Sequence, residues 1–329
     1  MTIRMGFNVG VVGCGRWGSQ HIDTLLKLKN QGFIGKIFAC DIHPLRLKNL
    51  PKTLDGVYSE WHEMIQSEDL DLVSIVTPNS THTSLGIAVL EQGLSVLVEK
   101  PIGSSLDEVR RLGKAAEESK GLLFSGYLLH HHSGFQYAKN LIQSQKLGRV
   151  KSIRYTKYSS RKKPDKADVI QNLASHAFSI IPDLLGTEQI PLFTLAMLLE
   201  NQKPTSLDSA SQAKFHMMYR DHEHLQPIEV EIQVAWGRES VSKLTVEGTK
   251  ENLRIHFQRH DSIEQGTLHS GYRRVQTLPS NPPLEQQYRN ILSAPSTTER
   301  PLATHLQTAT LLEKATRLAQ QWHQQNLEN

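Results

Sequence analysis

The chain begins with an apolar, β-branched run that ends in a glycine-rich turn, and this combination restricts the fold more than any other feature. Residues 7–12 read Phe-Asn-Val-Gly-Val-Val, as expected of a short strand buried on both faces of a parallel sheet. Gly13, Gly15 and Gly18 follow and open a predicted helix over 17–29. The first glycine permits a tight turn, the second lets the backbone approach a pyrophosphate, and the third lets helix and strand pack closely. The turn therefore predicts a dinucleotide site at a helix N-terminus.

An acidic residue closes the second predicted strand. Residues 36–40 form a short apolar run, and Asp41 follows it, 23 positions after Gly18. A carboxylate at this place accepts hydrogen bonds from the adenosine ribose hydroxyls and repels a 2′-phosphate, so it favours NAD over NADP. Asp41 can alternatively serve as a turn residue or as a cap of the helix that begins at Pro44.

Buried strands and amphipathic helices alternate along the first part of the chain. The strands are predicted over 72–76, 95–98 and 122–125, and the helices over 61–67, 80–92 and 106–119. The last helix begins at a capping box formed by Ser105 and Glu108. This alternation with short connections predicts an α/β domain over residues 1–125, built on a doubly wound parallel sheet of the Rossmann type.

Ligands of such sheets bind at the carboxyl ends of the strands. Four segments are expected there: the glycine turn with Arg16 and Trp17, Asp41, the run Thr77-Pro78-Asn79, and the run Glu99-Lys100-Pro101. We therefore expect one cofactor crevice where these segments converge.

The pattern changes after residue 125. Helices are predicted over 135–145, 175–185 (broken near Pro182) and 304–321, and strands over 150–158, 192–199, 213–219, 228–236, 242–247 and 252–257. Residues 228–235 alternate strictly between apolar and polar, so one face of their sheet is buried. The sequence predicts an α+β domain over 126–329, with a mostly antiparallel open sheet covered by helices on one side.

Composition excludes several classes of protein. A chain of 329 residues with 38% hydrophobic and 21% charged residues suits a globular protein of two domains. The longest apolar runs are far shorter than the roughly 20 residues that span a bilayer, and the N-terminus lacks the features of a signal peptide. Cys14 and Cys40 are the only cysteines, which excludes a disulfide framework. We expect a cytoplasmic protein without membrane or nucleic-acid partners.

Three polar clusters need interpretation. Arg161-Lys162-Lys163 is the densest basic run, and it is either a solvated loop or an electropositive lip for a phosphate or carboxylate on a substrate. The runs His130-His131-His132 and His222-Glu223-His224 suggest a metal. We reject a metal site, because adjacent histidines point in different directions and the usual ligand spacing is absent.

Several motifs together resemble the Gfo/Idh/MocA oxidoreductases, which include glucose-fructose oxidoreductase and inositol dehydrogenase. They are the string from Gly13 to His21, the string from Val76 to His82, Val98-Glu99-Lys100-Pro101, Gly126, the string from Lys146 to Val150, and the string from Leu244 to Gly248. Within the family, the turn at Gly13–Gly18, the segment Leu173–His176 and the pair Arg300-Pro301 are most similar to the nucleotide-sugar 3-dehydrogenases.

The resemblance implies an NAD-dependent enzyme that oxidises a secondary hydroxyl of a sugar. Such chemistry needs a base for the hydroxyl proton and a donor near the developing carbonyl oxygen. By resemblance, Lys100 touches the substrate and His176 lies on a helix of the second domain, and either can take the proton. The pair is expected to face the nicotinamide across a cleft between the domains. The cofactor contacts implied in addition to the turn are His82, Glu99 and Lys100.

The resemblance also implies a substrate-binding set and shows one departure. Tyr127, His131 and His132 are expected to line the substrate cleft. The family often has an aspartate four residues before the histidine, where this chain has Asn172, which keeps the hydrogen bonding and loses the charge. We expect Asn172 to bind a substrate hydroxyl.

Other functions stay open. One is a dehydrogenase of free polyols such as inositol, and another is a catalytically idle NAD-binding regulator, although retention of Lys100 and His176 counts against it. The family usually associates through the open face of the second-domain sheet, so the resemblance implies a homodimer or homotetramer.

Overall fold

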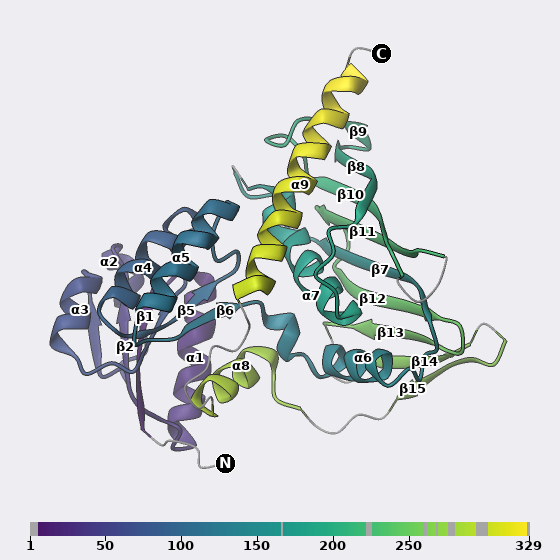
Figure 1. The fold of residues 1–329 in the computed structure, drawn as a ribbon. Helices are drawn as coiled ribbons and strands as arrows, with labels where there is room; N and C mark the ends of the chain where they lie inside the picture. Colours follow the sequence, from purple (N-terminus) through teal and green to yellow (C-terminus); the bar gives the residue numbers. More distant parts are fainter. Residues whose placement is uncertain are drawn as a thin grey trace. The chain divides into compact units, whose positions relative to one another are not determined.

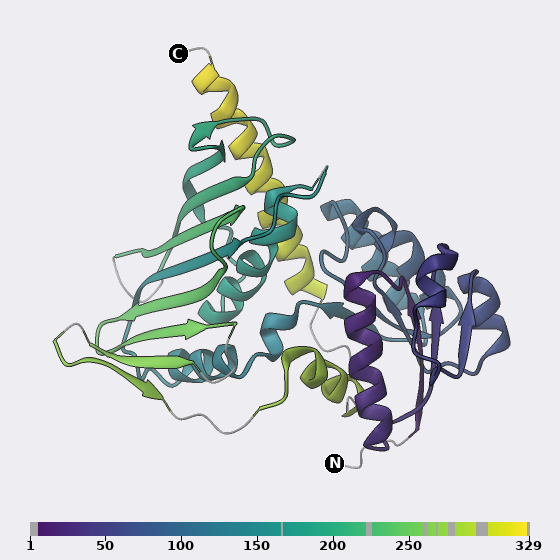
Figure 2. The ribbon, with the colours of Figure 1, turned by 180° about the vertical axis from the view of Figure 1, so that it is seen from behind.

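The computed structural model describes residues 6–165, 167–221, 226–258, 262–267, 269–275, 280–293 and 302–327. The chain forms two compact units, seen in Figures 1 and 2. The first unit comprises the chain up to Leu128 together with Asn281–Leu306, and the second comprises Leu129–Ser280 together with the chain from Gln307 onward. The division into a cofactor domain and a substrate domain at residue 125 stays a prediction, and the compact units add Asn281–Leu306 to the first part of the chain.

The first unit is built on a six-stranded sheet in the order β3-β2-β1-β4-β5-β6, with every neighbouring pair parallel. This strand order is that of a dinucleotide-binding fold and confirms the predicted doubly wound sheet. The strands are β1 Phe7–Val12, β2 Ile34–Cys40, β3 Gly56–Tyr58, β4 Leu72–Ile75, β5 Ser95–Glu99 and β6 Leu123–Gly126.

Helices cover both faces of this sheet. They are α1 Arg16–Asn30, α2 Pro44–Lys48, α3 Trp61–Ser67, η1 Asn79–Thr81, α4 His82–Glu91, α5 Leu106–Glu118 and α8 Pro283–Ser293. Helices α1 and α8 lie on one face, and α4 and α5 on the other (Figures 1 and 2). The capping box is confirmed, because the Ser105 hydroxyl accepts a hydrogen bond of 3.2 Å from the backbone N–H of Glu108.

Helix α8 is absent from the sequence predictions. Its buried residues Tyr288, Ile291 and Leu292 belong to the same apolar cluster as Leu25 and Leu28 of α1. The C-terminal part of the chain thereby supplies a piece of the first unit's core.

The second unit contains a nine-stranded sheet in the order β15-β14-β13-β12-β7-β11-β10-β8-β9. The strands are β7 Val150–Ser159, β8 Leu192–Glu200, β9 Lys203–Pro204, β10 Gln212–Tyr219, β11 Ile228–Trp236, β12 Val241–Gly248, β13 Asn252–His256, β14 Ile263–Thr267 and β15 Gly271–Val275. The neighbouring pairs are antiparallel, as predicted, except for β7 and β11, which are parallel. Strands β9, β14 and β15 were not predicted, since they are short and carry little apolar signal.

Helices cover one face of this sheet (Figure 1). They are η2 Leu128–His131, α6 Ser133–Gln143, the π-helical turn η3 Ile170–Ala174, α7 Ser175–Leu185 and α9 Leu302–Leu327, of which the part from Gln307 belongs to this unit. Phe178 of α7 packs on Phe215 of β10, with ring centroids 5.4 Å apart.

The predicted break near Pro182 is wrong, because α7 continues through it to Leu185. Most of α7 is buried, and this packing offsets the hydrogen bond that a proline removes from a helix.

A polar network fastens α7 to its neighbours. His130 of η2 lies with Nε2 2.7 Å from the Ser179 hydroxyl and Nδ1 3.1 Å from Asp183 Oδ2. Lys139 of α6 donates to the other carboxylate oxygen of Asp183 at 2.8 Å. Burial opposes the charged carboxylate, but the bonds from His130 and Lys139 outweigh it and hold the pKa of Asp183 well below its ordinary value.

The Asp183 network makes a prediction about pH. Because the folded-state pKa is lowered, its stabilisation is fully present above the unfolded value near 3.9 and is lost as the pH falls through the folded pKa. Asp183→Asn should lower the free energy of unfolding by about 1–3 kcal/mol at pH 7, and the difference from the parent should shrink below about pH 4. Denaturant unfolding across pH measures it, with the exposed Asp107→Asn as control. An equal loss at every pH would contradict the assignment.

Candidate active site

A pocket of about 610 Å³ lies in the first unit, where β1, β2 and β4 end. Its walls include the predicted cofactor residues Gly13, Gly15, Arg16, Trp17, Asp41, Thr77 and Pro78. They also include Ile42, His43, Arg46 and Trp61, which the sequence analysis did not single out. Three of the four segments expected at the strand ends thus share one pocket.

The three glycines of the turn meet different surroundings. A Cβ at Gly13, whose φ is +98°, would lie 2.6 Å from the carbonyl oxygen of Val76, and one at Gly18 would lie 1.9 Å from the carbonyl oxygen of Gly13. A Cβ at Gly15 would meet nothing within 4 Å. Gly15 is the N-cap of α1 and no side chain caps that helix end. The open space before the N-terminus of α1 fits a pyrophosphate, which accepts from the N–H groups there.

Asp41 lies at the end of β2 and anchors the pocket wall. Its Oδ2 accepts 2.8 Å from the Cys14 backbone N–H, its Oδ1 accepts 2.9 Å from the His43 N–H, and Arg46 Nη1 lies 3.1 Å from Oδ2. Burial opposes the charge, but these bonds outweigh it, so the pKa of Asp41 is lowered and the side chain is a carboxylate at neutral pH. Asp41 therefore takes part in a turn, and its bond to a ribose stays a prediction.

The residues that follow β4 lie in different surroundings. Thr77 and Pro78 line the pocket, and Asn79 begins η1. His82 is buried, with Nδ1 2.8 Å from the Pro101 carbonyl oxygen and Nε2 2.9 Å from the Thr77 carbonyl oxygen. His82 thus ties the pocket wall to the loop after β5, and its expected contact with the cofactor is untested.

Lys100 directly follows β5, and the residue before it is a buried carboxylate. Glu99 Oε2 accepts 3.1 Å from the Lys100 backbone N–H, and Oε1 lies 3.3 Å from His21 Nε2. Burial opposes the charge, but His21 first and then Trp17 and Lys100 lower the pKa of Glu99. The Glu99 carboxylate lies among interior groups of this unit, and its expected contact with the cofactor is untested.

The network around Glu99 extends to residues that the sequence analysis missed. His21 Nδ1 lies 2.7 Å from the Tyr288 hydroxyl, which lies 2.9 Å from the Ser74 hydroxyl. Ser74, His21 and Tyr288 are all fully buried. His21 stands at the end of the glycine motif, which was a usable signal. Tyr288 gave no signal, because its helix was not recognised.

The second unit carries the other predicted reactive groups. Asn172 and His176 lie one turn apart on the continuous helical segment of η3 and α7. The Asn172 amide donates 2.8 Å to the Asp168 carbonyl oxygen. Lys100 belongs to the first unit and His176 to the second, and their meeting across a cleft stays a prediction.

The remaining predicted substrate contacts are buried. Tyr127 lies in the first unit, and His131 and His132 lie in the second. His132 is the N-cap of α6, because its Nδ1 accepts 3.0 Å from the Gly134 N–H. This cap gives His132 a structural role, and a substrate contact for any of the three is untested.

Neither a metal cluster nor a membrane-spanning helix occurs in the described part of the chain. No group of three or more histidine, cysteine, aspartate or glutamate side chains there is arranged to hold a metal ion. His222-Glu223-His224 lies outside the described residues. None of the described helices has both the length and the apolar character needed to cross a bilayer.

The fold and the pocket define the class of the first unit as a dinucleotide-binding α/β domain. Residues 7–127 match the model of an oxidoreductase family with an NAD-binding Rossmann fold, the Gfo/Idh/MocA family. This match covers the cofactor part of the chain, and the motifs of that part agree with it. Arg300-Pro301, one basis for the finer likeness to nucleotide-sugar 3-dehydrogenases, lies outside the described residues.

Similar proteins include dehydrogenases of polyols and sugars. The chain is 24% identical over 204 residues to a myo-inositol 2-dehydrogenase of Thermotoga maritima, covering 59% of this chain and 60% of that one. It spans 48 to 60% of the length of the first curated relatives it matches.

Solved structures share the fold over nearly the whole chain. A levoglucosan dehydrogenase in complex with NADH and L-sorbose has a TM-score of 0.80 at 16% identity, covering 97% of this chain and 98% of that one. The WlbA dehydrogenase of Bordetella pertussis in complex with NADH and UDP-GlcNAcA has a TM-score of 0.75 at 17% identity, covering 98% of both chains. At these identities the likeness establishes the fold.

The glycine turn gives a paired prediction. Gly18→Ala should lower the melting temperature and weaken NAD binding, because its Cβ collides with the Gly13 carbonyl oxygen. Gly15→Ala should keep the melting temperature and weaken NAD binding by about tenfold or more, since its Cβ enters space that only the pyrophosphate needs. Calorimetric titration with NAD and thermal denaturation separate the two effects. Unchanged NAD affinity in Gly15→Ala would show that the pyrophosphate lies elsewhere.

The Glu99 network gives a second prediction. Tyr288→Phe removes a hydroxyl that pairs two buried groups and should cost about 1–3 kcal/mol of unfolding free energy. Ser74→Ala and the double variant complete a cycle, in which the two changes should be clearly non-additive because the side chains share one hydrogen bond. Denaturant unfolding measures all four proteins, and strict additivity would contradict the network.

Proposed function

We propose that the protein is an NAD-dependent dehydrogenase that transfers a hydride between a secondary hydroxyl of a sugar and the cofactor. One observation carries the proposal: the pocket that fits a dinucleotide opens where parallel strands β1, β2 and β4 end, and Lys100 directly follows β5 in the same sheet. In such a sheet the carboxyl ends of the strands share one edge. Lys100 is therefore suited to act beside the cofactor.

The chain's own groups would supply the acid–base chemistry. When bound, NAD supplies the hydride acceptor. Lys100 would donate a hydrogen bond and positive charge to the oxygen of the reacting hydroxyl as it becomes a carbonyl. The His176 imidazole would accept the hydroxyl proton on a ring nitrogen, the usual role of histidine as a general base. In the alternative assignment, Lys100 instead of His176 would accept the hydroxyl proton.

The buried Glu99 carboxylate would position Lys100. Its Oε2 bonds the Lys100 backbone N–H, and its Oε1 is held near His21. The position of the backbone before the lysine is thus fixed by an ion buried in the core. In this proposal Glu99 is a positioning residue and Lys100 is the group that reaches the substrate.

We propose a division of labour in which residues 1–125 bind NAD and residues 126–329 bind the substrate and form the oligomer. Asp41 is ionised, which supports NAD over NADP, since a second negative charge at the ribose would be repelled. Asn172 lies one turn before His176 and would bind a substrate hydroxyl. Tyr127, His131 and His132 would complete the substrate cleft.

The substrate we favour is a nucleotide-activated sugar. The likeness of the motifs to nucleotide-sugar 3-dehydrogenases supports it, as does the shared fold with WlbA in complex with UDP-GlcNAcA. The alternative is a free polyol such as inositol, supported by the inositol dehydrogenases among the relatives.

We also propose a cytoplasmic homodimer or homotetramer joined through the open face of the nine-stranded sheet. That face carries charged pairs: Arg154 and Lys214 lie 3.0 and 3.2 Å from the Glu231 carboxylate. Burial opposes the charge, but Gln233, Arg154 and Lys214 together lower the pKa of Glu231 to about 2. Such a face suits a polar interface.

The function is tested by absorbance near 340 nm after mixing the protein and NAD with nucleotide sugars, free sugars and inositols. The parent should reduce NAD with one class, Lys100→Met should lose turnover by about 10³-fold or more, and His176→Gln by about 10²-fold or more. His176→Gln should bind NAD as the parent does, because His176 belongs to the second unit, and Lys100→Met should still bind NAD. Turnover that survives Lys100→Met would overturn the assignment. Silence of the parent with every class, despite NAD binding, would favour the regulator.

A further inference from the structure

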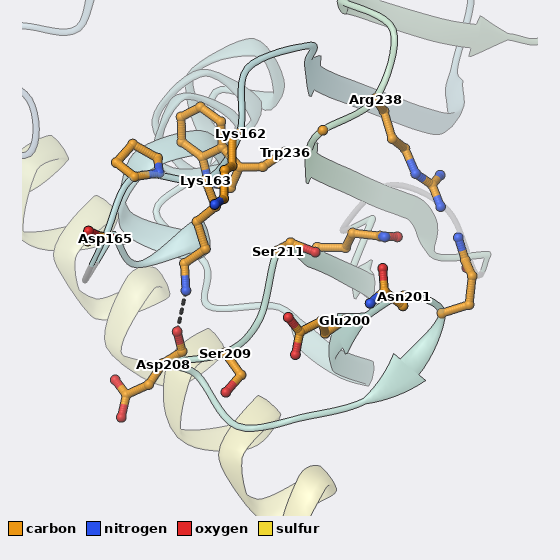
Figure 3. Close-up of a pocket in the computed structure, with 14 residues that line it drawn as sticks. Lys162, Lys163, Asp165, Glu200, Asn201, Asp208, Ser209, Ser211, Trp236 and Arg238 are labelled. Atoms are coloured by element: carbon orange, nitrogen blue, oxygen red, sulfur yellow. Dashed lines mark hydrogen bonds between the residues drawn. The ribbon is translucent and has the colours of Figure 1, made fainter.

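We propose that a second pocket, in the second unit, binds the phosphate ester of an activated sugar substrate. The proposal rests on the proposed function for the identity of that substrate, and on the geometry of this unit alone for the site. The pocket has a volume of about 770 Å³, which is enough for a nucleotide. Figure 3 shows it.

The position of the pocket follows from the topology of the sheet. Strands β7 and β11 are parallel neighbours, and β10 is antiparallel to both β11 and β8, so β7, β8 and β11 run in the same direction. Their carboxyl ends lead into the pocket walls: Lys162–Asp165 after β7, Glu200–Gln202 at the end of β8, and Trp236–Arg238 at the end of β11. A fourth segment, Asp208–Gln212, closes the pocket before and at the start of β10.

Cationic side chains line the pocket from two of these segments. Lys162 and Lys163 come from the basic run after β7, and Arg238 comes from the turn after β11. Lys163 donates to the Asp208 carbonyl oxygen and so links the two loops on one side, while Arg238 lies on the opposite side of the view (Figure 3). These groups suit a phosphate, to which lysine and arginine donate charge-assisted hydrogen bonds.

The other polar groups suit hydroxyls. Glu200, Asp165 and Asp208 carry carboxylates that balance the three cations of the wall, and Asn201, Ser211 and Gln212 add neutral donors and acceptors. The Asp208 carboxylate points away from Lys163 in Figure 3. A wall with both charge signs and several amides matches a ligand that carries a phosphate together with sugar hydroxyls better than it matches a free anion.

Trp236 adds an apolar surface to the polar wall. Its indole is a flat ring beside the charged groups, and an aromatic ring offers a surface on which the sugar or base of a ligand can pack.

The wall is continuous with the segment of the predicted reactive groups. Asp168, a few residues after Asp165, accepts hydrogen bonds from the Ile170 and Gln171 N–H groups at 2.7 and 3.2 Å. Its carbonyl oxygen accepts from the Asn172 amide. The chain that forms the basic wall therefore runs directly into the helix of His176.

The site is tested by calorimetric binding to the full chain saturated with NAD, which fills the first pocket. The probes are inorganic phosphate, glucose 1-phosphate and UDP. We expect the two esters to bind more tightly than phosphate, and Lys162→Gln and Arg238→Gln each to raise their Kd by about tenfold. Trp236→Ala, which removes the apolar surface of the wall, should raise the Kd several-fold. Lys151→Gln, an exposed lysine of β7 outside the pocket, is the matched control and should stay within twofold.

The outcomes answer two questions: which ester is the ligand, and whether the pocket binds esters at all. Tighter binding of UDP identifies a nucleotide sugar, and equal binding of glucose 1-phosphate identifies a sugar phosphate, and both support the site. Ester binding that none of the three pocket variants weakens, or no binding at about 10 mM, overturns it. Because the measurement needs no turnover, ester binding by a protein that never reduces NAD would refute the proposed function and leave the site standing.

Discussion

The buried carboxylate of Glu99 is the constraint on which the first unit depends. An isolated charge in a protein interior costs several kcal/mol, so it persists only where partners surround it. His21 comes from α1, Ser74 from β4 and Tyr288 from α8, and together they form a chain of contacts that ends at Glu99. Four elements spread over most of the sequence are thus held in register around one ion. Lys100 is the next residue in the chain, so the Glu99 contacts also fix the position of its backbone.

The network also explains why the C-terminal part of the chain returns to the first unit. His21 lies on the buried face of α1, which packs on the sheet. Its Nε2 lies near Glu99, so its Nδ1 needs a hydrogen-bond partner. Tyr288 supplies that partner, and Ile291 and Leu292 of the same helix bury apolar surface against α1. Two effects therefore hold α8 in its place beside α1: the burial of apolar side chains and the hydrogen bond between His21 and Tyr288.

Local patterns explain which parts of the fold the sequence could predict. The parallel strands are continuous apolar runs, the capping box marks the start of α5, and the glycine turn needs conformations that only glycine adopts easily, so each signal lies within a few residues. Helix α8 has a usable amphipathic pattern but lies after a run of strands and gives no hint of the unit it joins. The parallel pairing of β7 with β11 and the continuation of α7 through Pro182 are set by packing between distant segments.

The residues of the candidate sites also differ in how far local sequence patterns predict them. Gly13, Gly15, Asp41 and Thr77 could be placed at one pocket from sequence, because they stand at strand ends, whose positions topology fixes. His132, His82 and Glu99 make a helix cap, contacts to two loop carbonyls and a buried contact with His21, none of which the sequence showed. Sequence reveals that a polar residue stands near a site but not whether its lone pairs are already taken. The basic run after β7 could not be interpreted from sequence, because the cations and amides that line the second pocket come from loops after β7, β8 and β11 that are far apart in the chain.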